Sequence, residues 1–111
     1  MEKFMLIFHS GTPQHRSPEA MQAYMGKWMA WIDKLRKEGR YLSGEPLLPG
    51  GKLVKGPNKK VTDGPYTEAK EIVGGFFIIN AESYDDAVAI SKDYPDYEYD
   101  GSVQIRQVMK M

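Results

Sequence analysis

The feature that most constrains this chain is an abrupt change of character between residues 61 and 79. The first half of the stretch is polar and turn-forming, with Asp63-Gly64-Pro65-Tyr66 at its centre. The second half, Ile72–Ile79, is a run of β-branched and aromatic residues around two glycines. A continuous apolar run of this length is typical of a strand that is buried on both faces. We therefore predict a central strand that is entered from a loop rich in ionisable side chains.

The bulk properties of the chain exclude several classes of protein. Its 111 residues suffice for one core, and we predict a single domain over residues 1–111. The 15 basic and 15 acidic residues cancel, which argues against nucleic acid and against a membrane surface as partners. Cysteine is absent, which excludes thiolate chemistry and fits the cytoplasm. The apolar run Phe4–Phe8 is too short for a signal peptide or a membrane span.

Hydrophobic periodicity predicts the first helix and the strand before it. Phe4–Phe8 predicts a buried first strand. Ser17 and Pro18 are typical of a helix start, and Gly39 is typical of a helix end. Between them, apolar residues recur every three or four positions as one stripe: Met21, Tyr24, Met25, Trp28, Ile32 and Leu35. Core packing against a sheet explains this stripe better than a cofactor site does.

The remaining elements complete an α+β pattern. We predict a strand over Tyr41–Glu45, a lysine-rich hairpin over residues 52–62, a helix that Ser83 caps, a loop over residues 96–101, and a last strand over Ser102–Met109. This order indicates a ferredoxin-like split βαβ fold: a four-stranded antiparallel sheet, two helices on one face, and an inserted β-hairpin. The face without helices would then be buried against a second copy, which gives a homodimer and a dimeric α+β barrel.

The predicted topology brings four segments together at one edge of the sheet. His9 ends the first strand, Glu45 ends the second, the loop around Asp63 leads into the third, and Tyr99-Asp100 leads into the fourth. His9 is a candidate general base with Asp63 as its acidic partner. The structural alternatives are a histidine that caps a strand end and an aspartate that holds the Gly64-Pro65 turn.

Further candidates surround this edge. Glu45 and Tyr66 are candidate ligand-binding residues, and Glu68, Lys70 and Glu71 form a charged ligand-binding set or an exposed, salt-bridged loop. Arg106 can bind a carboxylate ligand or pair with a glutamate across the dimer. Two histidines without ligand spacing predict no metal site, and the glycine pairs lack the context of a phosphate-binding loop, so no cofactor is expected.

The chain resembles the DGPF-domain proteins of the YCII-related family. The resemblance rests on residues 62–71 and on Gly74-Gly75-Phe76, and it extends to the Ser43–Leu47 and Gly101–Arg106 segments. It implies a dimeric α+β barrel. Tyr66 stands where the signature usually has phenylalanine. Trp28 stands where YCII-type proteins carry a helical histidine that is proposed to form an acid–base dyad, so that dyad is not carried over.

Three hypotheses about function follow. The first is a homodimer that binds a small molecule, with His9 and Asp63 as candidates for acid–base catalysis. The second is a non-enzymatic regulatory or interaction protein, because some relatives in the resembled family are joined to extracytoplasmic-function sigma factors. The third is a purely structural dimer module. We favour the first hypothesis.

Overall fold

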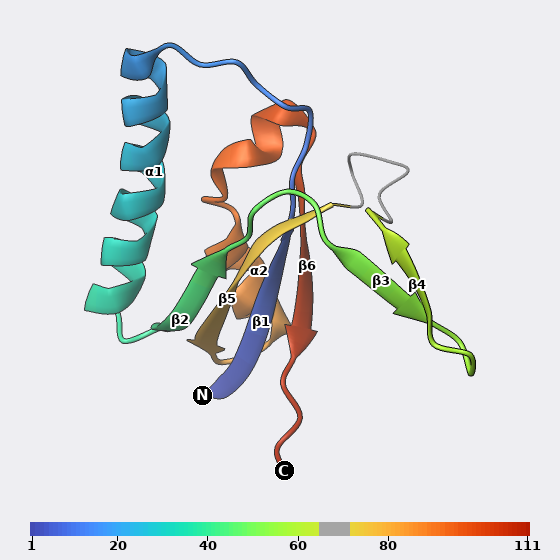
Figure 1. Ribbon diagram of the computed structural model, residues 1–111. Coiled ribbons are helices and arrows are strands. Elements are labelled where there is room, and N and C mark those ends of the chain that lie inside the picture. The colour runs from blue at the N-terminus through green and yellow to red at the C-terminus, as the bar shows by residue number, and fades with distance from the viewer. Residues whose placement is uncertain (65–71) are drawn as a thin grey trace.

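The computed structural model describes residues 1–64 and 72–111 of the chain, whose elements follow the predicted order (Figure 1). The strands are β1 (Glu2–His9), β2 (Tyr41–Pro46), β3 (Lys52–Lys55), β4 (Lys60–Asp63), β5 (Val73–Ala81) and β6 (Ser102–Gln107). The helices are α1 (Pro18–Lys37), α2 (Tyr84–Ser91) and a short 3₁₀ helix, η2 (Pro95–Tyr99).

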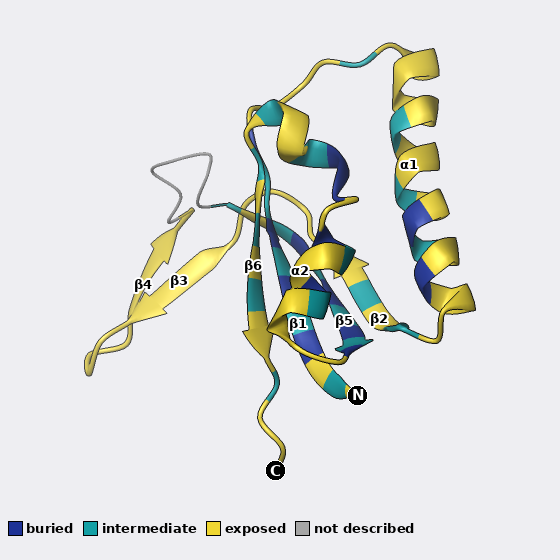
Figure 2. Ribbon diagram, turned by 180° about the vertical axis from the view of Figure 1, so that it is seen from behind, coloured by how far each residue is buried: buried dark blue, intermediate teal, exposed yellow. Residues whose placement is uncertain are grey.

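Four of the strands form an antiparallel sheet in the order β2-β5-β1-β6. β5 and β6 flank β1, so that Phe8 lies opposite both Gly75 and Val103. β2 is antiparallel to β5 and therefore parallel to β1. The helices α1 and α2 lie on the same side of this sheet (Figure 2). The predicted ferredoxin-like α+β fold is confirmed.

The core lies between the helices and one face of the sheet. Side chains alternate along β1, where Phe4, Leu6 and Phe8 are buried. β5 alternates in the same way because both strands present every second residue to the helices. The buried hydrophobic residues are Phe4, Leu6, Phe8, Trp31, Leu35, Phe77, Ile79, Ala81, Ala87 and Tyr94.

The other face of the sheet, which we call the open face, carries an apolar patch. Phe76 and Ile78 of β5 lie beside Ile7 and Met5 of β1 in the strand register. All four side chains are only partly buried within one chain. The expectation that β5 is buried on both faces is therefore wrong for the single subunit, because helices cover only one of its faces.

The ends of α1 follow the predicted capping chemistry. The Ser17 Oγ atom accepts a hydrogen bond of 3.1 Å from the N–H of Ala20, and Pro18 occupies the first helical position. Gly39, with φ +72°, adopts the left-handed conformation just after the helix. In the described part of the chain, no helix is long and apolar enough to cross a membrane.

The apolar stripe of α1 is buried only toward the C-terminal end of the helix. Trp31 and Leu35 are buried, whereas Met21 and Met25 are 43% and 49% exposed. Figure 1 shows the reason: the N-terminal half of α1 lies farther from the sheet than the C-terminal half. The prediction that the whole stripe packs on the sheet is wrong.

The segment predicted as a loop over residues 96–101 is largely the 3₁₀ helix η2. Pro95 supplies a backbone conformation suited to the first helical position. The carbonyl of Asp96 accepts a hydrogen bond of 2.9 Å from the N–H of Gly101, and Asp100, with φ 67°, ends the helix. The last strand ends at Gln107, two residues before the predicted Met109, which is 79% exposed.

Asp86 connects the start of α2 to the segment that follows α1. Its Oδ2 atom accepts hydrogen bonds from the backbone N–H of Glu82 at 2.8 Å and from Arg40 Nη1 at 2.5 Å. The Ser83 Oγ atom accepts from the N–H of Asp86 at 3.1 Å, which confirms the predicted helix cap. The Glu82 hydrogen bond, followed by the Arg40 guanidinium, lowers the pKa of Asp86.

We predict that Asp86→Asn destabilises the protein by about 1–2 kcal/mol at pH 7, because the charge-assisted contacts are lost. The folded-state pKa of Asp86 lies below its ordinary value of 3.8, so this stabilisation exists above that value and is lost as the pH falls through the folded-state pKa. The difference from wild type should therefore shrink below about pH 4. Urea unfolding, followed by tryptophan fluorescence, measures both effects. Asp85→Asn, an exposed acid in the same turn, is the control, and an equal loss in both variants would contradict the prediction.

Candidate functional site

The structure gives His9 and Asp63 different partners. His9 ends β1 on the open face, where its Nε2 atom lies 3.4 Å from Oε1 of Gln104. Asp63 ends β4 and forms an exposed ion pair with Lys52 across the hairpin. Within the described residues, no hydrogen bond or ion pair joins His9 to Asp63. An acid–base pairing of the two therefore stays a prediction.

The predicted ligand-binding residues that the structure describes lie at opposite edges of the sheet. Glu45 is opposite Phe76 on the edge strand β2, and Arg106 is opposite Met5 on the other edge strand, β6. The width of the sheet separates these two side chains. Four further candidates lie outside the described residues: Tyr66, Glu68, Lys70 and Glu71.

Backbone hydrogen bonds join the described strand ends at one edge, as the topology predicts. The N–H of Ser10 donates to the carbonyl of Ile72 at 3.0 Å, which joins the end of β1 to the approach to β5. The N–H of Thr12 donates to the carbonyl of Tyr99 at 2.7 Å, which adds the approach to β6. The end of β2 joins through its pairing with β5.

A cavity of about 360 Å³ lies on the helix side of the sheet, away from the open face. Residues of β1, α1, β2, β5 and the segment around η2 surround it, and its lining includes the predicted site residue Glu45 but none of His9, Asp63 and Arg106. The lining is mainly aromatic and apolar, with Tyr24, Trp28, Met29, Tyr41, Phe77 and Tyr94 among its members. This volume is at the small end of the range for organic ligands, which begins near 300 Å³.

Aromatic packing around Phe8 forms one wall of the cavity. The Phe8 ring stacks on Tyr94, with centroids 5.0 Å apart and planes 9° apart. It meets Phe77 edge-to-face at 4.8 Å and Trp28 edge-to-face at 5.2 Å. Each such pair stabilises the fold by about 0.5–1.5 kcal/mol beyond area burial. Residues from β1, α1, β5 and the segment before η2 are therefore held in fixed relative positions.

Asp96 supplies a carboxylate to this apolar wall. Its Oδ1 atom is buried and has no hydrogen-bond partner among the described residues. Burying a polar atom without a partner is costly, and native proteins seldom leave one unpaired unless a water or ligand serves it. The described side chains contain no cluster of three or more His, Asp or Glu residues that could hold a metal ion.

Two tyrosines near Asp96 keep their protons at neutral pH. Burial, assisted by the negative charge of the nearby Asp96, raises the pKa of Tyr24 to about 12. Burial also raises the pKa of Tyr94 well above its ordinary value, and its hydroxyl donates to the carbonyl of His9 at 3.3 Å. The cavity thus combines protonated phenols, Ser10 and two carboxylate residues, Glu45 and Asp96, with a mainly aromatic lining.

Sequence reasoning misses Asp96 because it treats residues 96–101 as a surface loop. The signal that could have found it is local: Tyr94-Pro95-Asp96-Tyr97 follows directly on a helix, so its aromatic residues can turn back toward the core. The periodicity of α1 places Trp28 in the core, whereas the structure leaves it partly buried in the cavity wall.

The comparisons with known proteins now identify the family. The model of the YCII-related domain matches residues 3–111. The chain belongs to the YCII-related family. One similar solved structure is 5-chloro-2-hydroxyhydroquinone dehydrochlorinase (TftG) from Burkholderia phenoliruptrix AC1100, in complex with 2,5-dihydroxybenzoquinone. The two chains are 18% identical with a TM-score of 0.50, and the match covers 97% of this chain and 95% of the TftG chain. At that identity the likeness shows the fold alone. Among functionally curated proteins, no match is found.

In this YCII-related protein, the helical position that the family resemblance links to a histidine is part of the aromatic enclosure. Trp28 packs edge-to-face on Tyr24 at 6.5 Å and on Phe77 at 5.8 Å. An indole has no basic nitrogen that could take a proton. Any proton acceptor in the cavity must therefore come from another residue. Glu45 and Asp96 both line the cavity, and among the described residues Asp96 has the buried oxygen atom that lacks a hydrogen-bond partner.

Gly44 provides space for the aromatic rings that line the cavity. A Cβ atom at this position would lie 2.6 Å from the Phe77 ring and 2.8 Å from the carbonyl oxygen of Phe76. Because the second contact is with the backbone of β5, a side-chain rotation cannot relieve it. The β2–β5 pairing beside the cavity thus requires glycine at residue 44.

We predict that Gly44→Ala destabilises the YCII-related protein by about 1–3 kcal/mol through overpacking. Gly26→Ala is the matched control, because a Cβ atom there meets nothing within 4 Å and alanine favours the helical backbone. That control should stabilise the protein by about 0.5–1 kcal/mol. Urea unfolding of both variants checks the prediction, and a neutral effect of Gly44→Ala would show that the strands can separate without cost.

Proposed function

We propose that this protein binds a small, planar, hydroxylated aromatic molecule in the cavity between α1 and the sheet. The observation that carries the proposal is the buried Asp96 Oδ1 atom, which lacks a hydrogen-bond partner among the described residues, in an aromatic enclosure. A flat ring can stack against such walls, and a hydroxyl group on the ring can donate to the carboxylate. The ligand of the solved TftG structure, 2,5-dihydroxybenzoquinone, is a hydroxylated six-membered ring and supports this class of ligand.

The cavity groups also suit proton transfer, which favours an enzyme over a passive binder. Asp96 can accept a proton from a bound hydroxyl group, and the protonated Tyr24 phenol can stabilise the resulting oxygen anion by donating a hydrogen bond. His9 and Asp63 stay candidates for acid–base catalysis, although His9 lies on the open face. We place this chemistry in the cytoplasm, which the absence of cysteine supports.

We also propose that the protein is a homodimer that forms through the open face. The centre of that face carries an apolar patch of four side chains: Met5, Ile7, Phe76 and Ile78. The helices α1 and α2 cover the opposite face of the sheet (Figure 2). Apolar side chains on the central strands of a one-sided sheet are normally buried against another layer. Two open faces in contact would supply this layer and give the α+β barrel.

The ligand prediction compares hydroxylated aromatics with their methyl ethers. Wild-type protein should bind hydroquinone at least about tenfold more tightly than 1,4-dimethoxybenzene, which cannot donate a hydrogen bond to Asp96. Asp96→Asn should remove most of this difference, whereas Asp93→Asn, an exposed acid paired with Lys34, should retain it. Calorimetric titration and quenching of the fluorescence of Trp28 and Trp31 measure the affinities.

His9→Ala separates the cavity from the open face in the same experiment. Because His9 does not line the cavity, its replacement should leave hydroquinone affinity unchanged. A loss of affinity in His9→Ala together with normal binding in Asp96→Asn would refute the cavity as the ligand site.

For the homodimer, we predict that Ile7→Lys raises the dimer dissociation constant about a hundredfold, because a charge would be buried in the apolar patch. Val88→Lys is the control, since Val88 is 39% exposed on α2, on the helix side of the sheet. Sedimentation velocity over a concentration series gives the dissociation constants. A wild-type protein that stays monomeric at all concentrations would rule out the dimer.

A further inference from the structure

The β3–β4 hairpin, residues 52–63, is a separate two-stranded sheet that we call the arm. All four residues of each arm strand are exposed. Val54 lies opposite Val61 in the register, and each of these side chains is 59% exposed. An isolated two-stranded hairpin is at best marginally stable in water. A regular arm with exposed valines therefore needs a further surface to pack against.

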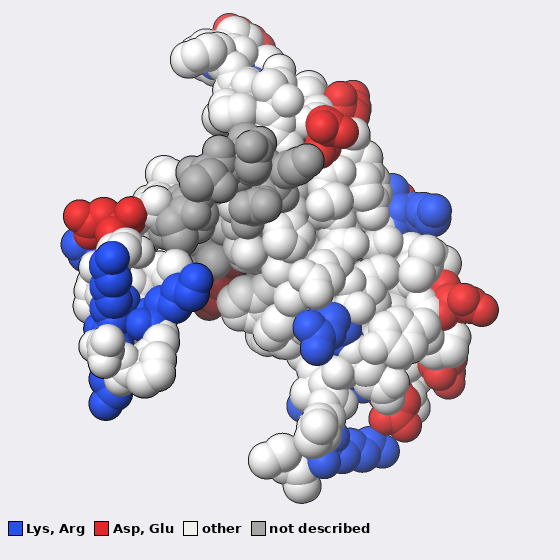
Figure 3. All heavy atoms as spheres, turned by 90° about the vertical axis from the view of Figure 1, so that its right-hand side faces the viewer, with Lys and Arg blue, Asp and Glu red and all other residues white. Residues whose placement is uncertain are grey.

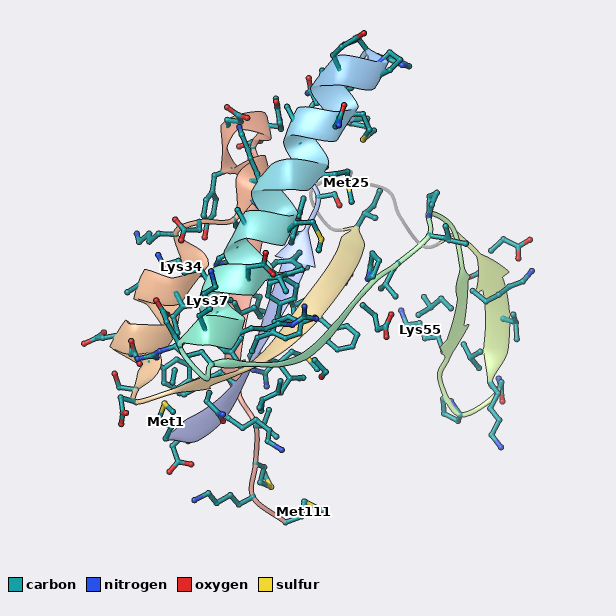
Figure 4. All side chains as sticks on the ribbon, turned by 90° about the vertical axis from the view of Figure 1, so that its left-hand side faces the viewer. Met1, Met25, Lys34, Lys37, Lys55 and Met111 are labelled. Atoms are coloured by element: carbon teal, nitrogen blue, oxygen red, sulfur yellow. The ribbon has the colours of Figure 1, made fainter. Side chains whose placement is uncertain are left out.

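The arm extends on the same side of the sheet as the open face. Figure 4 views the molecule from the side and shows the helices on one side of the main sheet and the arm, marked by Lys55, on the other. A second copy bound to the apolar patch of the open face would lie next to this arm. The arm is therefore positioned to contact the second copy rather than its own helices.

The charges of the arm and of the rest of the chain are opposite. The arm contains Lys52, Lys55, Lys59, Lys60 and Asp63, so its net charge is 4 − 1 = +3. The other residues contain 11 basic and 14 acidic side chains out of the 15 of each kind, which leaves −3. Figure 3 shows basic side chains gathered on the arm, while the visible face of the body carries both acidic and basic groups.

The arm also contains a repulsion that its own residues do not relieve. Lys55 and Lys60 are directly opposite in the register, and like charges in that position destabilise a hairpin. The arm's acid, Asp63, pairs with Lys52 at the other end of the hairpin. An acidic surface outside the arm would relieve the repulsion between Lys55 and Lys60.

We propose that the arm of each subunit packs against the acidic body of the second copy, so that the two arms make reciprocal contacts across the dimer. This inference rests on the proposed homodimer. The occupant of the arm's contact surface is another copy of this chain, because the arm lies on the side of the dimer interface and its +3 charge complements the −3 charge of the body.

The test has two parts that do not depend on each other. In wild-type protein, hydrogen exchange of the β3 and β4 amides should be slower above the dimer dissociation constant than below it, because the arm becomes covered. In Lys55→Glu/Lys60→Glu, the dimer should dissociate about tenfold more readily in low salt. The double charge reversal keeps two like charges opposite each other, so the hairpin itself is changed little.

Lys37→Glu/Lys92→Glu is the matched control, because it makes the same change of charge on the helix side. Sedimentation velocity should show that the arm variant differs from this control in low salt and approaches it in about 0.5 M NaCl, where surface charges are screened. Arm amides that exchange equally fast in monomer and dimer, with equal dissociation constants for the two double variants, would overturn the arm contact while the homodimer stands. A monomeric wild type would overturn both.

Discussion

The packing of Phe8 is the interaction on which the rest of the structure depends. Phe8 is the last core residue of the central strand β1, and its ring contacts aromatic residues from α1, β5 and the segment before η2. Beyond this contact α1 diverges from the sheet, so that the space between them is a partly open cavity rather than a continuous core. The residue that completes the hydrophobic core therefore also sets the position of the cavity wall.

The alternation of side chains along β1 and β5 separates two kinds of surface. Residues at even positions of β1, such as Phe8, point to the helices, while odd positions, such as Ile7 and His9, point to the open face. A ligand in the cavity and a second subunit on the open face would therefore use mostly different residues of the same strands, although Phe76 borders both. This separation explains why His9 points to the open face while Asp96 lines the cavity, although both residues lie near the same edge of the sheet.

The sequence predicts those parts of the fold that local patterns determine. Helix caps at Ser17 and Ser83, the glycine after α1, and the order of the strands follow from residue chemistry and from hydrophobic periodicity. The depth of burial along α1 does not, because Met21 and Leu35 belong to the same stripe and differ only in their distance from the sheet. Asp96 escapes prediction for the same reason: the burial of its carboxylate depends on how η2 packs against α1.

The place of the arm in the chain shows why the fold can include it without strain. The arm is inserted between β2 and β5, two paired strands that also surround the cavity. The N–H of Leu47 donates to the carbonyl of Gly74 at 2.9 Å, which holds the two strands together on the main-sheet side of the insertion. A second hydrogen bond, from the N–H of Gly64 to the carbonyl of Gly51 at 3.0 Å, closes the base of the arm. The first bond belongs to the β2–β5 pairing and the second to the arm itself, so the register of the main sheet does not depend on the exposed contacts of the arm. These contacts are therefore available to a surface outside the subunit.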